Sequence, residues 1–315
     1  MKKKALIVGI SGTELTKKEK IFLRRVKPWG IILFSRNIIN ILQLKALVSD
    51  IKKTINEKNY PVLIDEEGGK VSRINKIVNL KYFSQEYFSK LYFKNKKNFE
   101  KQYTSYINTV SYILNYVGIN INTVPVLDVK RENSHNIIGS RSYSSNPDIV
   151  SRLGNFCIKK YRKNKIFTVV KHIPGHGLSL HDSHFKTPII YKKESELIKK
   201  DFKPFRLSKS FFAMTAHIIY NAYDKNYTAT QSKIIIKQII RKKIKFSGIL
   251  ISDDISMKSL TLSLEKNALR SLEAGCNLIL HCNGKIKEMY KLAKVVPKID
   301  NFTEKKTSQF YKFLR

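Results

Sequence analysis

Cysteine is scarce in this sequence, which has only three such residues in 315. Cys157, Cys276 and Cys282 are too few for a disulfide framework and lack the paired spacing of a zinc ribbon. They are typical of buried thiols in a reducing compartment. Long apolar runs are also missing. No stretch reaches the roughly 20 residues of a membrane-spanning helix, and residues 5–10 are too few for the core of a signal peptide. We therefore expect a cytoplasmic protein without membrane insertion.

Acidic residues are few as well, with 24 Asp and Glu against 60 Lys and Arg, and the formal net charge is +36. Such a charge is typical of proteins that bind nucleic acid or an anionic membrane surface. The lysines are spread along the whole chain, however, and isoleucine and asparagine, which share AT-rich codons with lysine, are abundant too. Arginine, the preferred base-reading residue, is much the rarer cation. We interpret the charge as a solvated surface that reflects base composition, and we expect no specific nucleic-acid partner.

The 13 glycines form none of the common phosphate-binding motifs. Neither the G-x-G-x-x-G pattern of dinucleotide-binding proteins nor a P-loop occurs, and the metalloprotease motif H-E-x-x-H is missing too. These absences argue against a nicotinamide enzyme, and we expect no cofactor and no metal ion. The sequence also has no Pro/Gly/Ser-rich linker and no internal repeat, which predicts one catalytic domain over residues 1–315.

Short apolar runs rich in β-branched residues alternate with amphipathic, lysine-rich segments. Apolar residues recur every three or four positions in residues 15–26, 39–55 and 231–244, which predicts helices. Strands are predicted at residues 5–10, 30–35, 61–65, 122–129, 167–172, 211–217, 247–254 and 277–282. Strands alternating with helices indicate an α/β fold with a parallel sheet. Eight strands favour a single (β/α)8 barrel of the TIM type, although the pattern alone also permits a doubly wound sheet.

Polar residues stand at the C-terminal ends of these predicted strands. Five different strands end in or near Asp65, Asp128, His172, His217 and Asp253. The carboxyl ends of parallel strands share one face, and in a barrel that face carries the catalytic residues. The pattern therefore predicts an enzyme with its active site on this face.

Four of the seven histidines fall within residues 171–184, KHIPGHGLSLHDSH. A metal site, an acid–base site and a chance cluster would all give such a segment. Pro174 and Gly175 make a continuous helix through these histidines implausible, which disfavours a metal site. Asp182 and His184 are separated by one residue, so the carboxylate can fix the tautomer of the imidazole and support its protonated form. We therefore predict general acid–base chemistry here.

Asp253 and Asp254 end the seventh predicted strand. Adjacent side chains on a strand point to opposite sides, so we expect one carboxylate to face the site and the other to be held by hydrogen bonds, for example as a helix N-cap. A carboxylate at the end of a barrel strand can act as a nucleophile towards an anomeric carbon. For Asp65, capping, magnesium binding and the binding of sugar hydroxyls all remain open at this point.

Taken in order along the chain, the motifs resemble those of the family 3 glycoside hydrolases, in particular the bacterial β-N-acetylhexosaminidases of the peptidoglycan-recycling type. The resembling segments are GTELTKKE, GIILFSRN, IDEEGGKVSR, PVLDV, IIGSRSYSSNP, KHIPGHG followed after four residues by DSH, DFKPF, TAHIIYNAYD, TATQS, FSGILISDDISM and EAGCNLILHCN. Each motif alone is modest, but their order and spacing together are very specific. They extend over almost the whole chain.

The resemblance implies a (β/α)8 barrel and a retaining double displacement. Asp253 matches the family nucleophile, and Asp182 and His184 match the catalytic dyad, with His184 protonating the leaving oxygen and later activating water. The residues that match those holding N-acetylglucosamine in the first subsite are Asp65, Arg73, Arg141, Lys171 and His172. Lys70 stands where the family has an arginine, and the segment after Arg73 departs from the usual sequence, which leaves the leaving-group specificity open.

The function implied by the resemblance is the removal of terminal β-linked N-acetylglucosamine from muropeptides that carry 1,6-anhydro-N-acetylmuramic acid. A β-N-acetylglucosaminide phosphorylase is an alternative, since a neutral imidazole repels phosphate less than a carboxylate would; another family 3 β-glycosidase is a further one. A basic, non-catalytic protein that binds nucleic acid or glycan is a third, but such a binder would not need Asp253, Asp182 and His184 together. We expect a monomer whose partner is a small-molecule glycan or muropeptide substrate.

Overall fold

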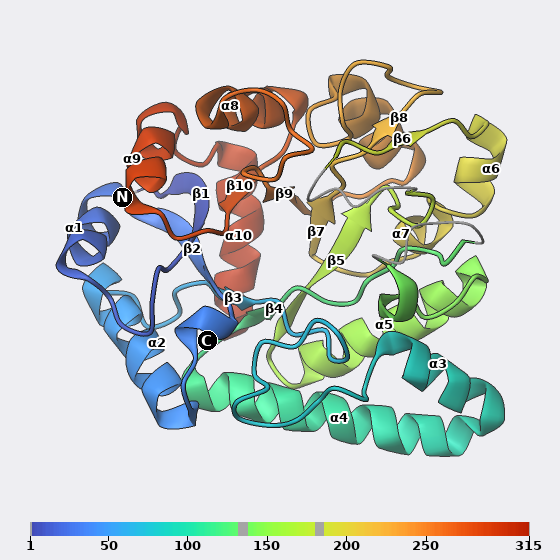
Figure 1. Ribbon diagram of the computed structural model, residues 1–315, viewed down its shortest axis with the longest axis horizontal. Coiled ribbons are helices and arrows are strands. Elements are labelled where there is room, and N and C mark those ends of the chain that lie inside the picture. The colour runs from blue at the N-terminus through green and yellow to red at the C-terminus, as the bar shows by residue number, and fades with distance from the viewer. Residues whose placement is uncertain (1, 132–137, 180–185, 315) are drawn as a thin grey trace.

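The centre of the fold is a closed barrel of parallel strands in the order β1-β10-β9-β7-β5-β4-β3-β2 (Figure 1). The computed structural model describes residues 2–131, 138–179 and 186–314. The barrel strands are β1 (Lys4–Gly9), β2 (Pro28–Leu33), β3 (Val62–Ile64), β4 (Ile121–Asn122), β5 (Phe167–Ile173), β7 (Phe212–Thr215), β9 (Ile249–Asp254) and β10 (Leu278–His281). Because β1 pairs with both β2 and β10, the sheet closes on itself. The predicted (β/α)8 barrel is confirmed, and the doubly wound alternative is excluded.

Most of the helices surround the barrel on its outside (Figure 1). They are α1 (Lys17–Val26), α2 (Ile41–Ile55), α3 (Gln85–Lys94), α4 (Lys96–Val117), α5 (Pro147–Lys163), α6 (Glu194–Lys199), α7 (Lys203–Arg206), α8 (Leu264–Ala274), α9 (Ile286–Val295) and α10 (Asn301–Leu314). Short 3-10 turns form η1 (Ser35–Asn37) and η2 (Gly139–Arg141), and a small separate sheet pairs β6 (Ile189–Ile190) with β8 (Ile219–Tyr220). Within the described residues, no helix combines the length and apolarity needed to span a bilayer.

Local sequence signals set the ends of the first two helices. Thr16 caps α1: its hydroxyl accepts from Glu19 N at 3.2 Å, and the Glu19 carboxylate accepts from Thr16 N at 2.8 Å. The α2 helix begins after Asn40, whose side chain accepts from Gln43 N, and it ends at Asn56 in the left-handed conformation. Both of these predicted helices are confirmed.

Two elements differ from their prediction. The strand predicted over residues 122–129 ends at Asn122, because Pro125 lacks the N–H that a sheet ladder needs. The helix predicted over residues 231–244 is present, but Ile235–Lys243 is wound as a π-helix (η3), in which Ile244 N donates to Ile239 O. The spacing could not distinguish the two windings, since either one places the four buried isoleucines of this segment on one face.

The two ends of the barrel are closed to different degrees. Across the N-terminal end lies α10, which Figure 1 shows behind the ring of strands. The Phe310 ring on α10 contacts the rings of Trp29, Phe167 and Phe212, which come from the starts of β2, β5 and β7. These aromatic contacts fill that end with apolar surface. The C-terminal end, where polar residues follow the strands, remains available for a site.

Candidate active site

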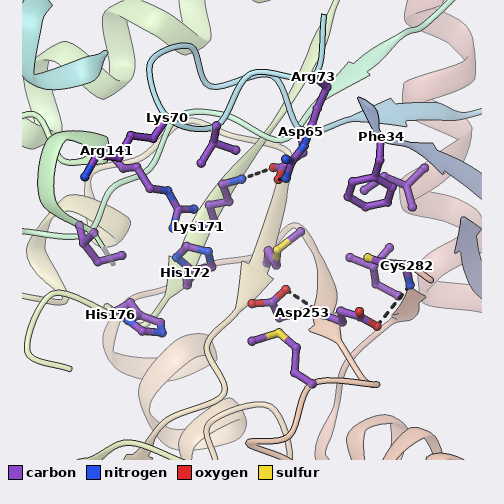
Figure 2. A pocket seen from close by; sticks show the side chains of 17 residues that line it. Phe34, Asp65, Lys70, Arg73, Arg141, Lys171, His172, His176, Asp253 and Cys282 are labelled. Atoms are coloured by element: carbon purple, nitrogen blue, oxygen red, sulfur yellow. Dashed lines mark hydrogen bonds and ion pairs between the residues drawn. The ribbon is translucent and has the colours of Figure 1, made fainter. Parts of the chain in front are cut away.

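A cavity of 340 Å³ opens at the C-terminal end of the barrel. Its polar lining includes Asp65, Arg73, Arg141, Lys171, His172 and Asp253 (Figure 2). Its apolar lining includes Ile32, Phe34, Met214, Met257 and Leu280. Polar groups that can bind hydroxyls therefore share one concave space with an apolar surface that can contact carbon-bound hydrogens.

Asp65, directly after β3, is the centre of an ion-pair network. One carboxylate oxygen accepts from Lys171 Nζ and from the Thr123 hydroxyl, and the other accepts from Arg73 Nη2 at 2.8 Å. Burial alone would raise the pKa of Asp65, but the charges of Lys171 and Arg73 outweigh it and hold the pKa well below its ordinary value. Asp65 is therefore an ionised acceptor whose two cations fix its position. A magnesium ion at Asp65 would have to compete with Lys171 and Arg73, each of which already binds one carboxylate oxygen.

Glu67 links two further lining residues and was not among the predicted site residues. Its carboxylate accepts from Arg141 Nε at 2.7 Å and Nη2 at 2.8 Å, and it lies 2.6 Å from Lys171 Nζ. The Glu67 side chain is only 2% exposed. Its burial opposes ionisation, but the charges of Arg141 and Lys171 keep its pKa below the ordinary value. Arg73, Asp65, Lys171, Glu67 and Arg141 thus form one chain of alternating charge along this wall of the cavity.

Asp128 fixes the orientation of His172. Its carboxylate accepts from His172 N at 3.1 Å and from ring Nδ1 at 2.7 Å, and it also accepts from His176 N at 2.6 Å. Burial would raise the pKa of Asp128, but the charge and hydrogen bond of His172 lower it below its ordinary value. Because a carboxylate only accepts hydrogen bonds, His172 Nδ1 carries a proton. The other ring nitrogen, Nε2, remains available to a substrate.

Replacing this carboxylate by an amide is expected to weaken substrate binding. In Asp128→Asn, the amide group donates to His172 Nδ1, so the neutral ring carries its proton on Nε2 instead. We expect kcat/KM to fall about 10- to 100-fold, as for the loss of a charged hydrogen bond. Steady-state kinetics and ¹⁵N NMR of the imidazole measure the two effects. Asp148→Asn, at a carboxylate whose side chain is 61% exposed, is the matched control; equal kinetics for both variants would contradict the role of Asp128.

Glu66 anchors the loop that carries Arg73. Its carboxylate accepts from Gly68 N at 3.1 Å, Ser72 Oγ at 3.0 Å, Arg73 N at 2.6 Å and Ile74 N at 3.1 Å. Burial is the largest influence on its pKa and raises it to about 7, although these four donors oppose the rise. The loop beside the cavity is therefore held by a buried acid that titrates near neutral pH.

The titration of Glu66 predicts a specific pH dependence of stability. The folded protein holds this proton more tightly than the unfolded chain, so the contribution of Glu66 to the free energy of unfolding falls as pH rises from about 4.5 to about 7. Glu66→Gln has no such titration. We expect the stability difference between wild type and variant to change by about 3 kcal/mol over this interval, in favour of the variant at high pH. Urea denaturation of both proteins at several pH values tests this, and a constant difference would contradict it.

Asp253 and Asp254 end β9 with different surroundings. Asp254 accepts from Ser256 N at 3.1 Å, from Ser256 Oγ at 2.8 Å and from Cys282 N at 3.2 Å, so it ties the turn after β9 to the end of β10. The Asp253 carboxylate accepts from Asp254 N at 2.8 Å and faces the cavity, with Asp65 and Arg73 on its far side in Figure 2. Asp254 lines the cavity as well, so the expectation that only one of the two carboxylates faces the site is not met. What distinguishes Asp254 is its set of hydrogen bonds to Ser256 and Cys282.

Two histidines at predicted strand ends do not line the cavity. His217 Nε2 donates to Asp254 O at 3.0 Å, and its Nδ1 lies 2.7 Å from Thr230 Oγ1. Burial lowers the pKa of His217 and favours the neutral ring. His281 Nε2 lies 2.9 Å from Glu288 Oε2. Both rings therefore support the ends of the strands from behind the cavity.

The structure brings six of the eight predicted site residues together in this cavity. They are Asp65, Arg73, Arg141, Lys171, His172 and Asp253. The predicted dyad, Asp182 and His184, lies outside the described residues. His176 also lines the cavity, with its ring centroid 5.3 Å from that of His172. In the described parts of the chain, no group of three or more His, Cys, Asp or Glu side chains could hold a metal ion.

The prediction missed the carboxylates that hold the lining cations and His172 in place. Glu67 stands two positions after Asp65, so an extended chain would place both on one side, and this spacing was an available signal. Asp128 was noted as a strand-end residue, but nothing in its sequence position indicates a contact with His172. Nothing in the sequence around Thr123 indicates its hydrogen bond to Asp65.

Comparison with known proteins gives matches over nearly the whole chain. A profile of the glycosyl hydrolase family 3 N-terminal domain matches residues 7–310. A β-hexosaminidase from Neisseria meningitidis serogroup B is 34% identical over 285 residues, covering 88% of this chain and 78% of the relative. One from Idiomarina loihiensis is 31% identical over 282 residues, covering 88% and 83%. The crystal structure of NagZ from Neisseria gonorrhoeae in complex with N-trifluoroacetyl-D-glucosamine superposes with a TM-score of 0.88 at 30% identity, covering 100% of this chain and 91% of that one.

Proposed function

The chain belongs to glycosyl hydrolase family 3, and on that premise we propose that it is a retaining exo-β-N-acetylglucosaminidase. The proposal rests on one feature of the cavity. The Asp253 carboxylate lines the same space as the alternating chain of ion pairs. A nucleophile and a set of hydroxyl-binding groups thereby share one concave site.

The groups of the ion-paired wall are suited to hold the sugar in one orientation. Asp65 is a fixed acceptor, and Arg73, Arg141 and Lys171 are fixed donors for ring hydroxyls. The His172 ring offers Nε2 as a further hydrogen-bonding group for the sugar, since Asp128 binds its other nitrogen, Nδ1. Because each of these groups is held by a neighbour before substrate arrives, little freedom is lost on binding.

The reaction then follows in two displacements. The Asp253 carboxylate attacks the anomeric carbon, the bond to the leaving oxygen breaks, and that oxygen takes a proton from His184, which Asp182 orients. In the second step a water molecule gives a proton to His184 and attacks the anomeric carbon, which breaks the bond to Asp253 and releases N-acetylglucosamine with retained configuration. The roles of Asp182 and His184 come from their match to the family motif.

For the substrate we propose terminal β-linked N-acetylglucosamine on muropeptides that carry 1,6-anhydro-N-acetylmuramic acid. The NagZ relative was crystallised with an N-acylated glucosamine, which supports an N-acyl sugar in the first subsite. We further propose a monomeric, cytoplasmic enzyme of cell-wall recycling. Free Cys157, Cys276 and Cys282 agree with a reducing compartment.

Release of a chromophore from an aryl N-acetyl-β-glucosaminide tests the activity. We expect turnover by the wild type and a partial loss in His184→Ala, because an aryl oxide leaves without much help from an acid. The product formed with and without added phosphate separates hydrolysis from phosphorolysis. An inert wild type that binds DNA in a salt-dependent manner would favour the non-catalytic alternative and overturn the proposal.

A further inference from the structure

A groove of 430 Å³ lies at the end of the barrel opposite the active-site cavity. It is formed by α2 from Lys45 onwards, by residues 56–58 and by the end of α4. The chain continues from these two helices into the N-terminal ends of β3 and β4. Four lysines line it: Lys45, Lys52, Lys53 and Lys58. These lysines lie within residues 45–58, a segment whose charge does not differ from that of the rest of the chain. The fold gathers them around one concave surface.

The positive charge of this groove is not neutralised by the acid beside it. Glu57 is the acidic residue in the lining, and Lys3 occupies it from the other side, with Nζ 2.6 Å from Oε2 and 2.8 Å from Oε1. For Lys52 Nζ, the described residues provide no hydrogen bond and no ion pair. The Lys52 ammonium lies against the end of α4, next to Gly118. A Cβ atom placed on Gly118 would be only 3.0 Å from Lys52 Nζ. Burial lowers the pKa of Lys52, and no acid counteracts that burial.

Other groups around the groove are also suited to an anion. Lys45 Nζ lies 4.0 Å from the centroid of the Tyr116 ring, which holds it at the edge of the groove. Asn56 also lines the groove, and its side-chain amide is of a kind that can donate a hydrogen bond to an anion. A second groove, which shares Asn56, Glu57 and Lys58, extends towards α10 and adds Lys312.

We propose that the groove between α2 and α4 binds the phosphoryl group of a small phosphorylated ligand. A phosphate ester carries up to two negative charges and three acceptor oxygens, so it can meet several ammonium groups at once, whereas a carboxylate carries one charge. The site is concave and only 430 Å³ in volume, which fits a small ester better than a flat lipid surface or a nucleic-acid duplex. This inference is independent of the glycosidase activity.

A purely structural explanation for Lys52 also exists and makes a different prediction. The last turn of α4 has no basic residue of its own, so Lys52 of α2 supplies a positive charge near its carbonyl groups. If that is its whole role, removing Lys52 lowers stability and changes no ligand binding. The two explanations are therefore separated by a binding measurement and not by stability alone.

The test is calorimetric titration of the full chain with glycerol 3-phosphate and with inorganic phosphate at constant ionic strength. We expect saturable binding that weakens about tenfold or more in Lys52→Met and in Lys45→Met. The control is Lys97→Met, which removes the same charge from the exposed, opposite end of α4 and should bind as the wild type does.

Several results would overturn the proposal. They are no saturable binding by the wild type, unchanged binding in both groove variants, or an equal loss in Lys97→Met, which would indicate net charge alone. Vesicles of phosphatidylglycerol and a short oligonucleotide serve as further probes. Binding to either of these without binding of glycerol 3-phosphate would assign the surface to a macromolecule and overturn the small-ligand site.

Discussion

Replacing Asp253 by asparagine is expected to lower kcat on an aryl N-acetyl-β-glucosaminide by about four orders of magnitude or more. The amide is close in size to the carboxylate, so the cavity keeps its shape. It is a far weaker nucleophile, however, and it cannot form the ester link to the anomeric carbon. KM should change much less than kcat, because the ion-paired wall that we propose binds the sugar does not include Asp253.

Asp254 provides the matched control for this experiment. It has the same side chain one position later and lines the same cavity, and its oxygens accept hydrogen bonds from Ser256 and Cys282. We expect Asp254→Asn to lower stability through these lost hydrogen bonds and to lower kcat far less than Asp253→Asn does. If Asp254→Asn were the more damaging change, the assignment of the nucleophile would be wrong.

A covalent label provides a second test of the nucleophile. A fluorinated N-acetylglucosaminyl substrate should label the Asp253 peptide covalently, which mass spectrometry detects.

The barrel strands could be predicted because each one leaves a local trace in the sequence. A buried strand needs a short apolar run, and its C-terminal end in this fold carries a polar residue, as at Asp65 and Asp253. The closure of the sheet was predicted from the number of strands and from the family resemblance and not from any local pattern, because it depends on β1 lying beside β10, with Leu6 opposite Ile279. No local pattern reports a contact between the two ends of the chain. The early end of β4 at Asn122 could have been predicted, because Pro125 was visible in the sequence.

The residues of the candidate site also fall into those that could be predicted and those that could not. Asp65, Lys171, His172 and Asp253 could be predicted because they stand at strand ends or in motifs of the family. Glu67 could not be assigned a role, because its significance depends on Arg141 and Lys171, which reach it from other loops. The spacing of Glu67 from Asp65 marks it as a candidate, but only the folded arrangement shows which cations it neutralises.

Replacing Glu67 by glutamine is expected to lower the free energy of unfolding by about 3–5 kcal/mol. The buried carboxylate now neutralises Arg141 and Lys171 together, and its side chain is 2% exposed. The amide has one acceptor oxygen, and its NH₂ group would point at a cation. Asp65 would then be left as the partner of both Lys171 and Arg73. We therefore also expect KM to rise, because this change breaks the chain of ion pairs that positions the cations proposed to bind the sugar.

Glu86→Gln is the control for this prediction, because Glu86 also accepts from two cations, Lys90 and Lys130, but is partly exposed at 26%. Ion pairs at such a surface contribute about 1 kcal/mol or less, so the free energy of unfolding of Glu86→Gln should remain close to that of the wild type.

The pH dependence of stability provides a second check. The pKa of Glu67 is held below its ordinary value, so its stabilisation is complete above the unfolded-state value of about 4.5 and is lost as pH falls through the lower folded-state pKa. The stability gap between wild type and Glu67→Gln should therefore be widest at neutral pH and narrow in acid. A gap that is independent of pH would mean that glutamine disturbs the packing of the loop and that the charge of Glu67 is not what holds Arg141 and Lys171 in place.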